Sequence, residues 1–187
     1  MKPGVRALGL AESFRADRST LAGVVTRASR VVDGFAFGTC TVGGTDATDA
    51  ICALFDDLGR EDVRYVLVSG IAPAWFNVVD LHRVADHTDR PVLSVTYEKS
   101  EGLEPALRAQ FDGDALDRRL ATYRDQPDRQ CVTVDDDTLF VRAVGLDDGE
   151  AAAVVDGFTP EGGRPEPLRV ARLAARGADD LRRADAD

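Results

Sequence analysis

The segments VRALGLAE (residues 5–12), TLAGVVTRA (20–28) and VDGFAFGTCTV (32–42) decide the fold of this chain. Each of them is rich in residues that favour strands, and turn-forming residues separate one from the next. Strands that are joined by such short loops pair antiparallel. The first 45 residues therefore predict an antiparallel meander of three strands.

The rest of the chain alternates between helical and strand patterns. Residues 47–58 carry apolar side chains at a helical spacing, and the apolar runs 63–69 and 92–97 are typical of strands buried on both faces. The remaining segments are predicted helices at 78–87, 103–111, 114–124, 147–156 and 166–176, a strand at 138–144, and a surface loop or weak strand at 125–137.

This order predicts one α/β domain with a mixed sheet over residues 1–177, followed by a polar tail at 178–187 that frays. The ribonuclease H-like fold uses the same order of elements. Periodicity alone does not exclude other three-layer α/β folds. The sequence contains no glycine-rich phosphate loop, nucleophile elbow or internal repeat.

The charge composition is unusual. Asp and Glu number 33 against 23 Lys and Arg, which gives a net charge of −10 among 187 residues. Aspartate outnumbers glutamate 25 to 8, and arginine outnumbers lysine 21 to 2. Two interpretations are open: adaptation to the molar salt of a halophile, or GC-rich codon bias, which explains the arginines but not the excess of aspartate. If the protein is adapted to molar salt, its excess of acidic residues does not exclude nucleic-acid binding, because such an excess is then a property of the whole proteome.

The sequence also bears on where the protein is located and on whether its cysteines and histidines bind a metal. Apolar runs are far shorter than the ~20 residues that a membrane span needs, and no signal peptide begins the chain, so we expect a cytoplasmic protein. Cys40, Cys52 and Cys131 match no metal-binding spacing and are expected to be reduced thiols. His82 and His87 lie on different helix faces, which argues against a paired metal site.

Three motifs carry a family resemblance: GGTDATDAI (43–51), SGIAPAWFNVVDL (69–81) and GGRPEPLRVARLAA (162–175). Together they resemble an archaeal family of uncharacterised proteins known as DUF99 or UPF0215, over about residues 4 to 177. That family is distantly similar to endonuclease V, a metal-dependent nuclease with the ribonuclease H-like fold that acts on deaminated bases. The resemblance therefore implies this fold and a nucleic-acid partner.

The resemblance also implies where a magnesium site would lie. Endonuclease V holds Mg²⁺ with acidic residues, because this hard cation prefers oxygen ligands and activates water for attack on phosphate. Of the corresponding positions here, Asp46 keeps the carboxylate, whereas Ala11, Ser69 and Leu146 depart from the pattern. A reduced site from Glu12 and Asp46, helped by Asp49 one helical turn later, remains conceivable.

Structural roles compete with these functional ones. Asp46 can simply cap the helix at 47–58, as can Thr48, and Glu12 can be a solvated carboxylate at a strand end. The candidate substrate-binding residues are Trp75, Phe76, Asn77, Asp80, Arg164 and Arg169. The Trp75–Phe76 pair can stack on a base or simply fill a gap in the packing, and Asn77 and Asp80 can instead cap a helix. Arg164 and Arg169 can contact phosphate, but Arg169 can equally form an ion pair with Glu166.

We therefore expect a protein that binds nucleic acid weakly through a cleft between residues 43–49 and 69–80 and that cuts it poorly or not at all. Two alternatives stay open: an active, divergent Mg²⁺-dependent endonuclease on DNA or RNA, and an enzyme that acts on another small substrate in the same cleft. Replacing two carboxylates by Ala11 and Ser69 lowers the negative charge of the site by two and leaves Mg²⁺ with too few ligands.

The acidic composition generates a prediction about salt. At low ionic strength the 33 carboxylates repel one another, whereas in molar salt the screening length falls to about 3 Å. The unfolding midpoint is expected to rise strongly between 0.1 M and 3 M KCl, as measured by thermal melting. Equal midpoints at both concentrations favour codon bias over adaptation to salt.

Overall fold

The computed structural model describes residues 1–184. The chain alternates strands and helices, with the strands concentrated at the start as predicted. In chain order the elements are β1 (Arg6–Phe14), β2 (Arg18–Arg27), β3 (Val32–Thr41), α1 (Ala47–Leu58), β4 (Val63–Ser69), α2 (Pro73–Phe76), α3 (Leu81–Thr88), β5 (Val92–Thr96), α4 (Glu104–Gln110), α5 (Gly113–Arg124), β6 (Gln130–Val134), β7 (Asp137–Val144), α6 (Asp148–Gly157) and α7 (Glu166–Ala184).

The strands form one mixed sheet in the order β3-β2-β1-β4-β5-β7-β6. The first three strands form the predicted antiparallel meander, and β1, β4 and β5 pair in parallel. The β6–β7 hairpin extends the sheet by antiparallel pairing of β7 with β5. The carboxyl ends of β1, β4 and β5 therefore lie at the same edge of the sheet.

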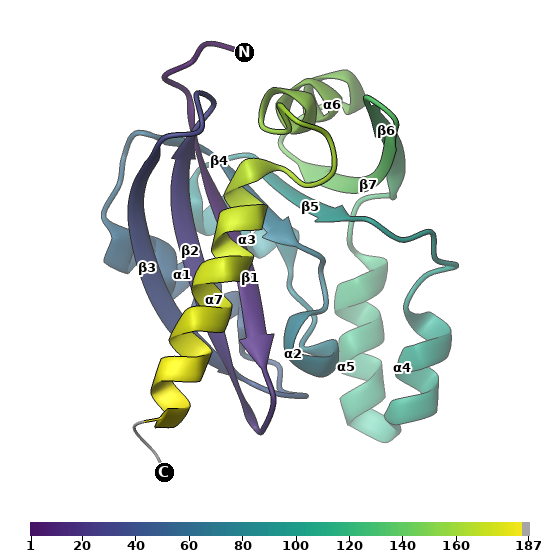
Figure 1. The fold of residues 1–187 in the computed structure, drawn as a ribbon. Helices are drawn as coiled ribbons and strands as arrows, with labels where there is room; N and C mark the ends of the chain where they lie inside the picture. Colours follow the sequence, from purple (N-terminus) through teal and green to yellow (C-terminus); the bar gives the residue numbers. More distant parts are fainter. Residues whose placement is uncertain (185–187) are drawn as a thin grey trace.

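Helices cover both faces of the sheet (Figure 1). Helix α7 crosses one face over β1 and β2, while α1 and α3 lie behind the other face. Side chains of β1 alternate between the layers: Leu8 and Leu10 pack with Ile51 of α1, and Ala11 packs with Ala171 of α7. Helices α4 and α5 lie side by side beyond β5.

Helix α7 lies directly on β1 because β1 has a glycine at the crossing. A Cβ atom added to Gly9 would lie 2.3 Å from both the carbonyl carbon and the carbonyl oxygen of Pro167. Nothing larger than glycine fits against this backbone without moving the helix. Ala11 and Ala171, both buried, continue the close approach one turn further along α7.

The end of α7 differs from the expectation. We expected residues 178–187 to be a frayed tail, but α7 continues to Ala184, and 185–187 lie outside the described residues. The helix is held by Asp179, which is fully buried, accepts a hydrogen bond from Thr20 at 3.2 Å and pairs with Arg182 and Arg183. A buried acid in a polar sequence is not visible from periodicity.

One other segment also differs, and the alternative left open at 125–137 is decided in favour of a strand. The helix expected at 78–87 begins only at Leu81, because the Asp80 side chain accepts a hydrogen bond from the Arg83 backbone and caps it. Before it, Ala74, Trp75 and Phe76 have φ values of 48°, 55° and 63°, so α2 is a left-handed turn. Within 125–137, residues 130–134 form a strand that pairs with β7. No helix within residues 1–184 is both long and apolar enough to span a membrane.

The contact between Gly9 and Pro167 generates a prediction. Replacing Gly9 by alanine is expected to lower the free energy of unfolding by about 3 kcal/mol, since the new methyl group collides with backbone atoms that cannot rotate away. Gly38→Ala in β3 is the matched control, because its Cβ would lie 3.8 Å from Leu54, an ordinary contact. Equal changes in urea unfolding for the two variants would contradict this account of the packing.

Candidate nucleic-acid interface

Asp46 anchors the turn between β3 and α1. Its carboxylate accepts hydrogen bonds from the backbone N–H of Thr41 at 3.0 and 3.1 Å, from the Thr41 hydroxyl at 2.8 Å and from the Asn77 amide at 2.7 Å. Burial alone would raise the pKa of Asp46, but these hydrogen bonds outweigh it and hold the pKa below the usual value. The side chain points back to β3 and does not cap α1.

Asn77 takes the place of that cap. Its side-chain oxygen accepts a hydrogen bond from the Ala47 backbone at 2.9 Å, and its amide donates to Asp46 and to the Thr41 carbonyl oxygen. Asn77 is fully buried, so it cannot serve the substrate contact that we expected. Asp80 also has a structural role, because it caps α3 and its backbone N–H binds Thr48.

The other carboxylates of the expected site have separate partners. Glu12 accepts a hydrogen bond from Ser19 at 2.7 Å, and Asp49 forms an ion pair with Arg83. Glu12 and Asp46 share one neighbour, Cys40. Burial first, and then both negative charges, raise the pKa of this thiol to about 11.

These residues do not fit a magnesium site. Among residues 1–184, no group of three or more His, Cys, Asp or Glu side chains is arranged to hold a metal ion. The oxygens of Asp46 are occupied by Thr41 and Asn77, and Ala11 is buried under Ala171 of α7. Mg²⁺ needs only one or two carboxylates beside water and phosphate oxygens, but Glu12, Asp46 and Asp49 here each bind a separate protein group.

The Trp75–Phe76 pair combines packing with exposure. Trp75 packs against Gly43, contacts Phe76 and Phe111, and still exposes 45% of its surface. Phe76 is held between Trp75 and Phe111. Arg119 of α5 fixes the turn, because its buried guanidinium donates to the carbonyl oxygens of Phe76, Gly43 and Gly44.

A hollow near these elements lies at the carboxyl ends of β4 and β5. It has a volume of about 440 Å³ and is bounded by the loops 69–72 and 96–103 and by residues of α5, β7 and α7. Carboxyl ends of parallel strands are where α/β sheets bind ligands. Residues 43–49, which we expected to form one wall of the cleft, do not line it.

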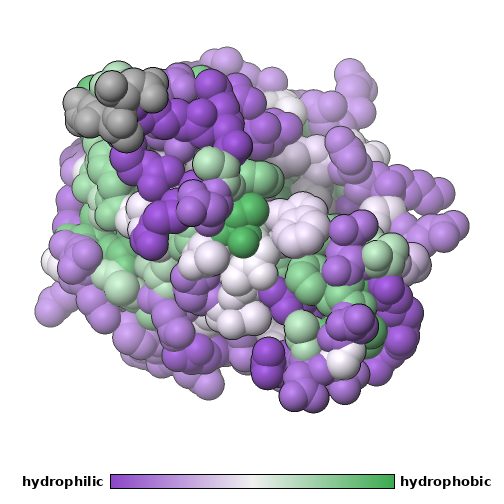
Figure 2. Space-filling model, turned by 90° about the horizontal axis from the view of Figure 1, so that it is seen from below, coloured by the Kyte–Doolittle hydropathy of each residue, from purple (hydrophilic) through white to green (hydrophobic). Residues whose placement is uncertain are grey.

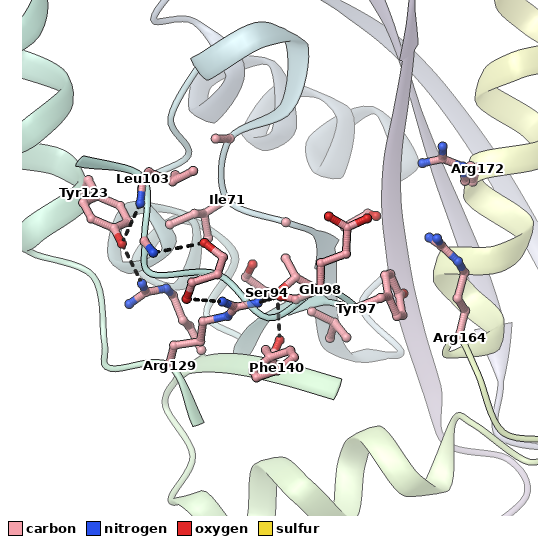
Figure 3. Close-up of a pocket in the computed structure, with 18 residues that line it drawn as sticks. Ile71, Ser94, Tyr97, Glu98, Leu103, Tyr123, Arg129, Phe140, Arg164 and Arg172 are labelled. Carbon is pink, nitrogen blue, oxygen red and sulfur yellow. Dashed lines mark hydrogen bonds between the residues drawn. The ribbon is translucent and has the colours of Figure 1, made fainter. Parts of the chain in front are cut away.

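Four arginines line this hollow, and they come from opposite sides (Figure 3). Figure 3 shows Arg129 on one side and Arg164 and Arg172 on the other, where α7 and the residues before it lie. Arg142 lines the hollow from β7. None of the four forms an ion pair with a carboxylate of the described residues. Arg129 donates to the Thr96 hydroxyl at 2.7 Å and lies 4.1 Å from the centre of the Phe140 ring.

Between the two pairs of arginines lies Tyr97, at the end of β5. Its ring stacks under Arg164, whose guanidinium carbon is 4.0 Å from the ring centre. The Tyr97 hydroxyl is buried and has no hydrogen-bond partner among the described residues. Burial raises the pKa of Tyr97 to about 12, so the phenol is a neutral hydrogen-bond donor inside an arginine-lined hollow.

The model of the family described as Endonuclease dU matches residues 3–178 of this sequence. The chain belongs to this family. A UPF0215 protein of Thermococcus kodakarensis is 36% identical over 184 residues, which cover 94% of this chain and 92% of that protein. The family resemblance inferred from the three sequence motifs is therefore confirmed.

Solved structures share the fold of this chain. A protein of unknown function from Archaeoglobus fulgidus aligns with a TM-score of 0.83 and 27% identity, covering 93% of this chain and 98% of that one. Endonuclease V of Ciona intestinalis, in complex with a 24mer DNA containing an inosine followed by a ribo-adenosine, aligns with a TM-score of 0.60 and 12% identity, covering 96% and 87%. The predicted ribonuclease H-like fold is confirmed.

Within this member of the Endonuclease dU family, sequence reasoning missed most of the arginine-lined hollow. Arg164 is the one substrate-binding candidate that lines it, while Arg169 is paired with Glu166 at 2.7 Å on the surface of α7. Arg142 had a visible signal, because it interrupts the apolar strand TLFVRAV. Arg172 also had a visible signal. No acidic residue lies three or four positions away from it, so it has no ion-pair partner on its own face of the helix.

The network around Asp46 generates a prediction about stability and pH. Asp46→Ala is expected to lower the free energy of unfolding by about 2–3 kcal/mol at pH 7, because it leaves the buried Asn77 amide short of a partner. The pKa of Asp46 is lowered in the folded protein, so its contribution is complete above ~4, the pKa of an unfolded aspartate, and is lost as the pH falls through the folded value.

Urea unfolding of both proteins from pH 7 down to pH 2 is the measurement. The gap between the native protein and Asp46→Ala should narrow in acid, while Asp57→Ala, which removes an exposed carboxylate of the same helix, should change stability little throughout. A gap that stays constant with pH would show that the charge of Asp46 contributes nothing.

Proposed function

We propose that this protein binds single-stranded nucleic acid, with phosphate groups held in the arginine-lined hollow at the ends of β4 and β5. The observation that carries the proposal is the set of four arginines that lack a carboxylate partner among the described residues. In a chain with a net charge of −10, acids are available to pair almost any arginine. Four cations left together in one hollow favour an anion brought from outside.

The chemistry of the hollow suits a phosphodiester. Guanidinium groups present forked N–H donors that match phosphate oxygens, and such charge-assisted hydrogen bonds are stronger than neutral ones. The Tyr97 hydroxyl, which has no hydrogen-bond partner among residues 1–184, adds a donor beside Arg164. Trp75 offers an exposed ring on which a base can stack, and such stacking tolerates any base sequence.

The comparisons support the same ligand class. The family description, Endonuclease dU, names an activity on nucleic acid, and the Ciona intestinalis endonuclease V binds DNA in its crystal structure. Metal-dependent cleavage has weaker support. The carboxylate of Asp46 already accepts hydrogen bonds from Thr41 and Asn77, and Ala11 and Ser69 supply no carboxylate. We therefore propose poor cleavage or none, with binding as the main activity.

The test uses fluorescent single strands containing uracil or inosine, incubated with the protein in 2–3 M KCl with Mg²⁺ or Mn²⁺. Arg164→Ala is expected to weaken binding by about tenfold, the usual effect of losing one charged hydrogen bond. Arg118→Ala is the matched control, since this exposed arginine of α5 also lacks a carboxylate partner among residues 1–184 but does not line the hollow. Trp75→Ala should weaken binding as well.

Three results would overturn parts of the proposal. Clean Mn²⁺-dependent cleavage that Asp46→Asn abolishes would make Asp46 a metal ligand and establish an active endonuclease. Failure to bind any nucleic acid would favour the alternative of a smaller substrate in the same hollow. Equal affinities of Arg164→Ala and Arg118→Ala would place the binding surface elsewhere.

A further inference from the structure

A second hollow lies beside the first one, on the other side of Arg172. It has a volume of about 420 Å³ and lies between the carboxyl end of β1 and the C-terminal half of α7, with Glu12, Arg15, Arg176 and Asp180 among its walls. Arg172 lines both hollows, so the two are neighbours along α7. Figure 2 views the molecule from the end where the β1–β2 turn lies, and most of that face is hydrophilic.

The arginines of α7 fall into two groups. Arg169, Arg182 and Arg183 each pair with an acid of the same helix. Arg172 and Arg176, one helical turn apart, have no ion-pair partner among the described residues. The unpaired arginines are the ones that line the hollows, and the paired ones line neither.

Acids of the second hollow are occupied by other groups. Asp180 pairs with Arg15 at 3.2 Å, and Glu12 accepts the Ser19 hydroxyl at 2.7 Å. Arg172 and Arg176 have no ion-pair partner among residues 1–184, and of the two acids only Asp180 is neutralised by a cation, since Ser19 leaves the charge of Glu12 in place. A ligand with several negative charges in a row is therefore complementary to this stretch of α7.

We propose that a single nucleic-acid strand, bound in the first hollow, continues along α7 past Arg172 into the second hollow, where Arg176 contacts its backbone. This extension rests on the proposed function and adds the direction and length of the bound strand. The part of α7 along which the strand would run, from its first residue Glu166 to Arg176, is about 15 Å long at the helical rise of 1.5 Å per residue. That length corresponds to about four nucleotides at the ~3.4 Å rise of a stacked strand.

A length series separates the two hollows. Fluorescence anisotropy measures the affinity of labelled DNA and RNA strands from two to about twelve nucleotides, in KCl from 0.5 to 2 M. Arg164→Ala should weaken binding of every strand. Arg176→Ala should leave the dinucleotide unchanged, weaken strands of six or more nucleotides by about tenfold, and lower the slope of log affinity against log salt by about 0.7, the value for one lost phosphate contact.

Arg118→Ala again serves as the matched control and should change neither the length dependence nor the slope. If Arg164→Ala weakens binding but Arg176→Ala affects no strand, the extended path is wrong and the proposed function stands. If Arg176→Ala weakens the dinucleotide and the long strands equally, the path along α7 is also wrong. If neither variant weakens any strand, both the path and the proposed function are wrong.

Discussion

The close contact between Gly9 of β1 and Pro167 of α7 is the constraint on which the rest of the structure depends. Because glycine has no side chain, the first turn of α7 lies directly on β1. This placement buries Ala11 against Ala171 and positions Arg164 and Arg172 beside the ends of β4 and β5. The packing that fills the space around Ala11 with apolar atoms thus also brings arginines to the adjoining hollow. The edge of the sheet where the parallel strands end, at which the family resemblance implies carboxylates around a metal ion, is instead lined by arginines.

The loop network has a similar consequence for Asp46. In the sequence, the carboxylate of Asp46 precedes a helix and lies near another acid, a pattern that suggests a metal ligand. In the structure, this carboxylate instead stabilises the turn between β3 and α1. Thr41 and Asn77 supply the hydrogen bonds that a cation would otherwise replace, and Asn77 takes over the capping of α1. Arg119 completes the arrangement from α5 by binding the carbonyl oxygens of the same turn. The residue that the family resemblance implies for metal binding is therefore part of a stabilising network in this chain.

The sequence predicted the sheet well because local patterns determine it. Residues 47–58 and 63–69 were assigned with the bounds that the structure has, since a regular apolar spacing and a terminal glycine are local signals. The left-handed turn at 74–76 and the helical end of α7 were not predictable in this way. The turn depends on packing of Trp75 against Gly43, which is distant in sequence, and the end of α7 depends on Asp179 binding Thr20 across 159 residues. The arginine-lined hollow was missed for the same reason, because its walls come from five separate parts of the chain.

Pairing of charges distinguishes the surface of this acidic protein from its candidate interface. Most arginines bind carboxylates, as Arg6 and Arg27 do around Asp33, whose pKa these hydrogen bonds lower to about 2. Exposed pairs, such as Arg15 with Asp180, contribute little free energy each. Arg129, which has no ion-pair partner among the described residues, is held instead by the Thr96 hydroxyl and the Phe140 ring. Four of the arginines that lack a carboxylate partner among residues 1–184 lie together at the ends of the parallel strands, where a polyanion can reach them.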